Sequence, residues 1–147
     1  MNFQKFLLNK CTDFKGRKFK DILKFSDNEI EETHDFIQLI FPLNEPSSFS
    51  SNTHFIKSSE QLKELTSNLQ IKNNILISAD WFISFLSKNN HWITHYDHNH
   101  LRITRMIKSI RLIVGNAEAN NIYNKILSIE GVLSNVSKKS LKYWKEA

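Results

Sequence analysis

HNHLRITRMIKSI occupies residues 98–110 and carries the clearest structural signal in the chain. Each residue of an α-helix turns by about 100°, so apolar side chains at positions i, i+3, i+4 and i+7 share one face. This spacing is found in Ile103, Met106, Ile107, Ile110 and Val114. The pattern predicts a core-facing helix over residues 98–114, and we expect this helix to be central to the fold.

The other side of this helix also carries apolar residues. Leu101 and Leu112 lie roughly opposite the main apolar face, which predicts packing on both sides. Arg102 and Arg105 lie beside these leucines, so their guanidinium groups are expected to be partly buried. A buried guanidinium needs hydrogen-bond partners, and we expect acidic side chains to supply them.

Composition narrows the class of protein. The 147 residues fit one domain with a sizeable core, and few Gly and Pro argue against an all-β fold with many tight turns. One cysteine, Cys11, excludes a disulfide framework or a multi-cysteine zinc site. No signal peptide is apparent, and no stretch approaches the roughly 20 apolar residues of a membrane span. We therefore expect a soluble, cytoplasmic protein.

Capping residues and apolar spacing predict an all-α fold. Ser26 and Glu29 form a capping box that starts a helix running to about Phe41, where Pro42 ends it. Similar patterns elsewhere bring the total to about six or seven helices, including one over residues 69–86. We expect them to form a single compact domain over residues 1–147. Residues 47–53 are rich in Ser and Asn and predict a loop.

The apolar face of the predicted helix over residues 26–41 includes one histidine. His34 shares this face with Ile30, Ile37 and Phe41, and we interpret it as a core histidine hydrogen-bonded to the backbone rather than a ligand. The structural core of the two main helices is predicted to include His34, Ile37, Phe41, Pro42, Ile103, Ile107 and Ile110.

Charge is unevenly distributed along the chain. Residues 98–147 hold nine Lys and Arg against three Glu, whereas residues 27–45 hold six acids and no Lys or Arg. The basic part could meet nucleic acid or an acidic surface, but we favour pairing of the acidic helix with the basic one. The basic residues Lys15, Arg17, Lys18 and Lys20 are interpreted as a solvated face.

Two stretches together resemble a known family. Residues 33–47 read THDFIQLIFPLNEPS and residues 98–110 read HNHLRITRMIKSI. They resemble the HDYIQWLFPL and HNHLRITRILKSL signatures of the opioid growth factor receptor conserved domain. Residues 136–144 are also similar to that family's C-terminus, so the resemblance spans nearly the whole chain. We expect a minimal, single-domain member without the repeat-bearing tail of the animal receptors.

The resemblance implies a binding function. Animal members are described as nuclear receptors for an opioid pentapeptide that restrain growth, and they have no established catalytic mechanism. Leu39 stands where the family usually has Trp, which removes an indole N–H and much surface area. If that Trp shapes a ligand surface, this chain is expected to have lost the surface.

Fixed polar groups from the two signatures define the first candidate site. A cleft where the Phe41–Pro42 turn meets the N-terminus of the 98–114 helix would suit an acidic group. Two interpretations stay open: a structural network that fixes helix register, with Asp35, Glu31 or Glu32 paired to Arg102 or Arg105, and a pocket for a carboxylate, phosphate or peptide end. The candidate ligand-binding residues are Asp35, Gln38, Glu45, His98, Asn99, Arg102 and Arg105.

Two further candidates come from residue type. His91, His95, Asp97, His98 and His100 are metal-binding types, but their spacing matches no standard zinc site. We interpret Asp97 or Asn99 as a helix N-cap and expect no metal. Basic residues at every third or fourth position could track phosphates; they are Arg102, Arg105, Lys108 and Arg111, followed by Lys138, Lys139, Lys142 and Lys145 near Tyr143 and Trp144.

The functional prediction is a non-catalytic binding module. Its partner would be an acidic group, a peptide or a protein, and no cofactor is expected. The alternative is a nucleic-acid-binding protein that uses the basic C-terminal half. An enzyme of unknown reaction comes third, because no phosphate loop or nucleophile elbow is present and only Asp35 with His34 or His98 suggests a carboxylate–histidine pair.

Overall fold

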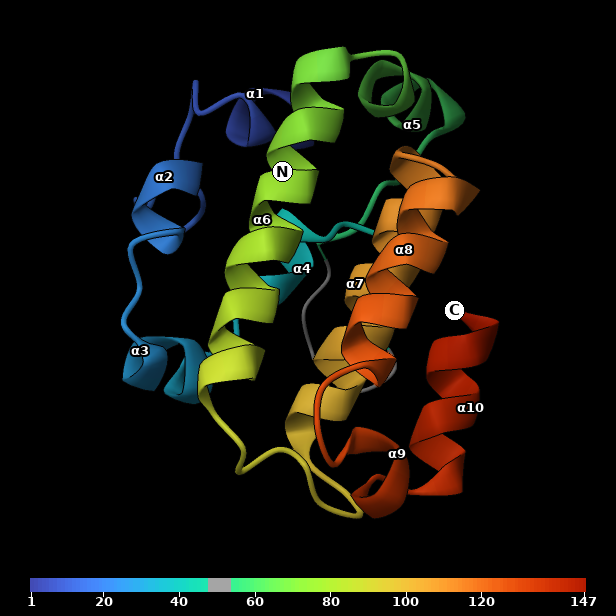
Figure 1. The fold of residues 1–147 in the computed structure, drawn as a ribbon. Helices are drawn as coiled ribbons and strands as arrows, with labels where there is room; N and C mark the ends of the chain where they lie inside the picture. Colours follow the sequence, from blue (N-terminus) through green and yellow to red (C-terminus); the bar gives the residue numbers. More distant parts are fainter. Residues whose placement is uncertain (48–53) are drawn as a thin grey trace. The chain divides into compact units, whose positions relative to one another are not determined.

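A computed structural model describes residues 1–47 and 54–147 (Figure 1). All regular elements over these residues are helices, which confirms the all-α class. Ten helices are described rather than six or seven, and five of them are short helices of four to six residues. Their bounds are α1 Phe3–Leu7, α2 Phe19–Ile22, α3 Asp27–Glu32, α4 Ile37–Ile40, α5 Ser59–Thr66, α6 Leu69–Lys88, α7 His98–Ile113, α8 Asn116–Leu127, α9 Val132–Asn135 and α10 Lys138–Glu146. Apart from Ser47, the predicted loop over residues 47–53 lies outside the described residues.

Contacts divide the chain into two compact units, Met1–Ser78 (unit 1) and Ala79–Ala147 (unit 2). The boundary falls within α6. Both units contain large, fully buried side chains, which include Phe3, Phe6 and Phe36 in unit 1 and Phe82, Trp92 and Trp144 in unit 2. None of the described helices combines the length and apolar character needed to cross a membrane.

Unit 1 is assembled around α1. This helix packs against α5, and the ring of Phe6 meets the ring of Phe19 edge to face, with centroids 6.2 Å apart. The last carbonyl of α1 accepts a hydrogen bond from α6, where Asn74 Nδ2 donates to the Leu7 oxygen over 2.7 Å. Side-chain packing and one part-buried amide thus join α1 to α2, α5 and the first half of α6.

The predicted helix over residues 26–41 is two short helices in the structure. Its start is confirmed: Ser26 Oγ accepts from the Glu29 backbone N–H over 3.2 Å, and the Glu29 carboxylate accepts from the Ser26 N–H over 3.1 Å. However, α3 ends at Glu32 because Thr33 adopts an extended backbone at φ −93° and ψ 126°. The helical hydrogen bonds resume only at α4.

This break corrects one predicted position. His34 is exposed rather than a core residue, because the i, i+4 spacing that aligned it with Ile30 does not cross the break. Gln38, a candidate ligand-binding residue, is 8 % exposed. The predicted burial of Ile37, Phe41 and Pro42 is confirmed.

Unit 2 is built on α7. This helix packs against α8 and α10 (Figure 1), and the predicted core positions Ile103, Ile107 and Ile110 are fully buried. Leu101 is 42 % exposed, so the prediction of packing on both sides is wrong at the start of the helix. The packing of α7 against its neighbours does not cover this first-turn side chain.

Candidate functional site

Asp35 forms its ion pairs with two basic residues of unit 1. Arg17 Nη1 donates to Asp35 Oδ1 over 2.8 Å, and the Lys15 ammonium group pairs with the other carboxylate oxygen. Arg17 Nε also donates to Asp13 Oδ2 over 2.6 Å. The Asp13 side chain is fully buried and accepts the backbone N–H groups of Lys15 and Arg17. Arg17 therefore bridges two carboxylates and ties the loop over residues 13–17 to Asp35.

The protonation of this cluster follows from its contacts. Burial opposes ionisation of Asp35, but hydrogen bonds and charge from Lys15 and Arg17 outweigh burial and hold the pKa of the carboxyl below its usual value. Burial lowers the pKa of Arg17, but the two carboxylates more than reverse this and raise the pKa above its usual value. Arg17 is thus not part of a solvated face, which corrects the sequence interpretation. A run of basic residues alone does not reveal a partner 18 positions away.

The other two candidate ligand residues of unit 1 differ in burial. Glu45 is exposed. Gln38 Oε1 is buried and has no hydrogen-bond donor among the described residues.

The candidate residues of unit 2 lie in the first half of α7. Asp97 is the N-cap, as predicted, because its Oδ1 accepts from the Asn99 N–H over 2.9 Å. Arg102 is 6 % exposed and its Nη1 donates to Asn99 Oδ1 over 3.3 Å, while Arg105 is half-buried. The predicted burial of both arginines is confirmed. His98 is exposed, with Nδ1 3.8 Å from an oxygen of Asp97.

Two predictions join residues of different units. They are the cleft between the Phe41–Pro42 turn and the start of α7, and the pairing of motif acids with Arg102 or Arg105. Both stay predictions. The partners that the structure gives to Asp35 are Arg17 and Lys15, which belong to its own unit.

His100 forms a buried network that sequence reasoning missed. Its Nε2 lies 2.8 Å from the Trp92 carbonyl oxygen, which can only accept, so Nε2 carries the proton. Nδ1 of the neutral ring then accepts from the Ser140 hydroxyl over 3.0 Å. The Trp144 indole N–H donates to the His100 carbonyl over 3.0 Å. Burial lowers the pKa of His100 below 6.5, which matches a neutral ring that joins α7 to α10.

The remaining metal-binding residue types of this region have separate contacts. Asp97 caps α7. His91 packs edge-on against Phe85 with ring centroids 6.2 Å apart, and His95 packs against Tyr96 at 4.5 Å. In unit 2, these side chains and His100 are therefore engaged in capping and packing at different places.

The basic residues of α7 do not form one exposed row. Arg102 is buried. Arg111 donates through Nε to the Ala147 carbonyl over 2.7 Å, through Nη1 to Asn116 over 3.1 Å and through Nη2 to Asn120 over 3.0 Å. This guanidinium group links α7 to α8 and α10, which is a structural role.

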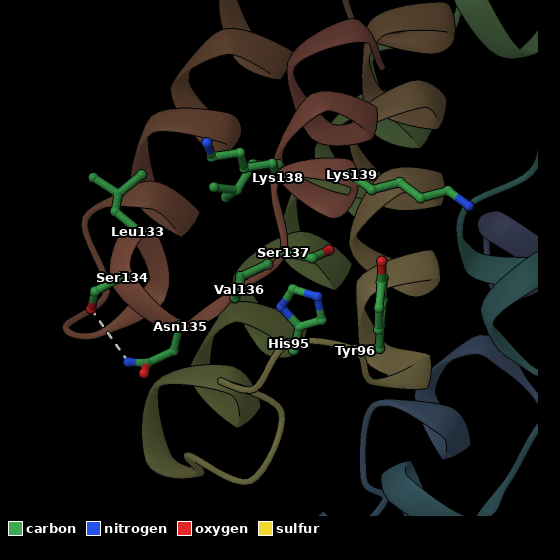
Figure 2. Close-up of a pocket in the computed structure, with 10 residues that line it drawn as sticks. His95, Tyr96, Leu133, Ser134, Asn135, Val136, Ser137, Lys138 and Lys139 are labelled. Carbon is green, nitrogen blue, oxygen red and sulfur yellow. Dashed lines mark hydrogen bonds between the residues drawn. The ribbon is translucent and has the colours of Figure 1, made fainter.

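An open pocket lies within unit 2 (Figure 2), and the sequence analysis did not predict it. Its volume is about 500 Å³. His95 and Tyr96 come from the loop before α7, and residues 133–139 with Leu141 form the rest of the lining. The two sides are joined where the Ser137 N–H donates to the His95 carbonyl over 3.1 Å. Nothing in the sequence places these two segments together.

The chemistry of this pocket is basic and partly apolar. Lys138 and Lys139 extend from the first turn of α10 (Figure 2), and none of the lining residues is acidic. Neither lysine forms an ion pair within residues 1–47 and 54–147. Tyr96 is 62 % exposed and Leu133 is 65 % exposed. The pocket thus offers two cations, an aromatic ring and an aliphatic side chain to a ligand.

Comparisons with known proteins found no match. No protein-family model, curated protein or solved structure matches the chain. Function is therefore argued from the side chains that the fold brings together.

Proposed function

We propose that the chain is a small relative of the opioid growth factor receptor conserved domain and serves as a non-catalytic module that binds an acidic partner protein. The signatures at residues 33–47 and 98–110 support the kinship. Because kinship does not define a function, the observation that carries the proposal is the open pocket of unit 2. Two lysines line this pocket and no acid does.

The side chains that line the pocket suit a protein ligand. Lys138 and Lys139 attract acidic groups and speed encounter with an acidic surface. Tyr96 and Leu133 are large side chains left exposed, and covering such side chains supplies most of the binding energy in protein interfaces. A volume of about 500 Å³ is in the usual range for ligand pockets.

Two titratable groups that could serve catalysis are engaged in structural contacts instead. The Asp35 carboxylate is held by Arg17 and Lys15, which stabilise its charged form. His100 is buried with both ring nitrogens bonded. Neither group is placed to transfer a proton to a ligand, and this favours binding over catalysis.

Nucleic-acid binding is the second candidate, and α10 supplies the observation that favours it. Four exposed lysines lie on this helix with Tyr143, which is 48 % exposed. Trp144, however, is fully buried and donates to His100, so it offers no surface for base stacking. The four lysines are Lys138, Lys139, Lys142 and Lys145.

Fluorescence anisotropy with a labelled polyglutamate peptide tests the proposal. We compare the wild type with a Lys138→Glu/Lys139→Glu variant and a matched Lys142→Glu/Lys145→Glu variant that carries the same charge change on the same helix. We expect the first variant to lose at least about tenfold in affinity, through like-charge repulsion in the pocket. The second variant should lose far less.

Two results would count against acidic-protein binding. One is equal weakening in both variants, which would indicate a diffuse charge effect. The other is tighter binding of a labelled single-stranded oligonucleotide than of polyglutamate, with steep dependence on salt and equal loss in both variants, which would support the nucleic-acid alternative.

A further inference from the structure

We infer that the pocket of unit 2 recognises a short extended peptide in which an acidic residue stands beside a bulky aliphatic residue. The inference rests on the proposed function and adds the class of ligand. It is carried by the placement of charge and of apolar surface around one pocket.

The acidic side chain would be held by a lysine ammonium group at the start of α10. At the start of α10 the Ser137 N–H donates to the His95 carbonyl, and the Ser140 N–H donates to Ser137 Oγ over 3.1 Å. Those donors are occupied. Lys138 and Lys139 keep their ammonium groups available, and the positive end of the helix dipole adds to their attraction.

The aliphatic side chain has a matching surface on α9. Leu133 is 65 % exposed, and it lines the pocket together with the buried Val136 and the half-buried Leu141. A leucine or isoleucine from a ligand would remove this apolar area from water, which is favourable in proportion to the area covered. The exposed ring of Tyr96 lies on the opposite flank (Figure 2).

Each flank of the pocket carries one lysine and one aromatic or aliphatic side chain. Figure 2 shows Leu133 and Lys138 on one flank and Tyr96 and Lys139 on the other. Neighbouring residues of an extended peptide rise by about 3.3 Å, so an acidic and an aliphatic residue adjacent or one apart can occupy the pocket together. A nucleic-acid strand would gain little from the aliphatic side chains of the pocket.

The test compares two labelled peptides of equal charge, measured by fluorescence anisotropy. One alternates glutamate and leucine, and the other has serine in place of each leucine. We expect the wild type to bind the leucine peptide about five- to tenfold more tightly, because part of a leucine side chain is buried. A Leu133→Ser variant should lose most of this preference and still bind polyglutamate.

A Leu69→Ser variant is the matched control. Leu69 is 72 % exposed and does not line the pocket, so the preference for leucine should persist. Equal affinity for the two peptides in the wild type would overturn the inference while leaving the proposed function standing. Absence of binding to polyglutamate and to both peptides would overturn the proposed function as well.

Discussion

His100 shows how one buried polar side chain sets local chemistry. Its Nε2 donates to the Trp92 carbonyl and its Nδ1 accepts from Ser140, so the neutral ring with its proton on Nε2 has both nitrogens hydrogen-bonded. Protonation would place a charge in a buried site and would require Ser140 to change from donor to acceptor. The lowered pKa follows from this cost of burial.

The free energy of unfolding is expected to decrease as the pH is lowered, because His100 is neutral in the folded protein. In the unfolded chain a histidine titrates near 6.5, whereas the folded ring stays neutral to lower pH. Below 6.5 the unfolded state therefore binds more protons, and the free energy of unfolding decreases as pH falls through that value towards the folded pKa. Urea unfolding at about pH 7.5 and about pH 5 measures the decrease.

A His100→Gln variant should lose part of this decrease, since it removes the titrating group. An unchanged pH dependence in the His100 variant would contradict the assignment of a neutral, buried ring.

Arg17 is expected to matter more for stability than its neighbour Lys15. An Arg17→Met variant leaves the fully buried Asp13 carboxylate without its charged donor, and we expect a loss of about 2 kcal/mol in the free energy of unfolding. A Lys15→Met variant should change it by no more than about 0.5 kcal/mol, because the lysine side chain is 56 % exposed. Chemical denaturation of both variants decides the point, and equal losses would show that Arg17 does not act as a bridge.

At the scale of elements, the sequence predicts the features that depend on neighbouring residues, such as helix starts and apolar faces. The capping box at Ser26 and the apolar face of α7 are local features, and both are confirmed. The break at Thr33 has no such local signal. It occurs next to Asp35, which accepts a hydrogen bond from Arg17, and a contact between residues 18 positions apart cannot be predicted from helical spacing. The error at His34 has the same origin, since a helical spacing was continued through the break.

The short helix α9 depends on a glycine just before it. Gly131 has φ +87°, in the left-handed region, and a Cβ there would lie 3.2 Å from Asn135 Nδ2. We expect a Gly131→Ala variant to lose about 1–2 kcal/mol in stability and to weaken peptide binding, since α9 lines the pocket.

Gly16 provides the matched control for this prediction. It has φ +77°, and a Cβ at this position would meet no atom within 4 Å, so a Gly16→Ala variant reports the backbone strain alone. Thermal or urea unfolding of the two variants should show the larger loss for Gly131→Ala. A smaller loss at Gly131 than at Gly16 would mean that the contact with Asn135 relaxes without cost.

At the scale of the whole molecule, the residues that line the candidate site belong to neither of the two main signatures, 33–47 and 98–110. The signature residues Asn99 and Arg102 are buried, and Asp35 is engaged within unit 1. The pocket instead combines a loop before α7 with α9 and the start of α10. Lys138 and Lys139 could be seen in the sequence as basic residues, but their place around one pocket with Tyr96 is a product of tertiary structure.

The central claim is that the pocket of unit 2 is the binding surface. Nuclear magnetic resonance of ¹⁵N-labelled protein, titrated with the alternating glutamate–leucine peptide, tests it most directly. We expect saturable amide shifts concentrated at Tyr96 and at residues 133–141. Saturable shifts concentrated instead at residues 35–45 would place the binding surface in unit 1 and contradict the claim.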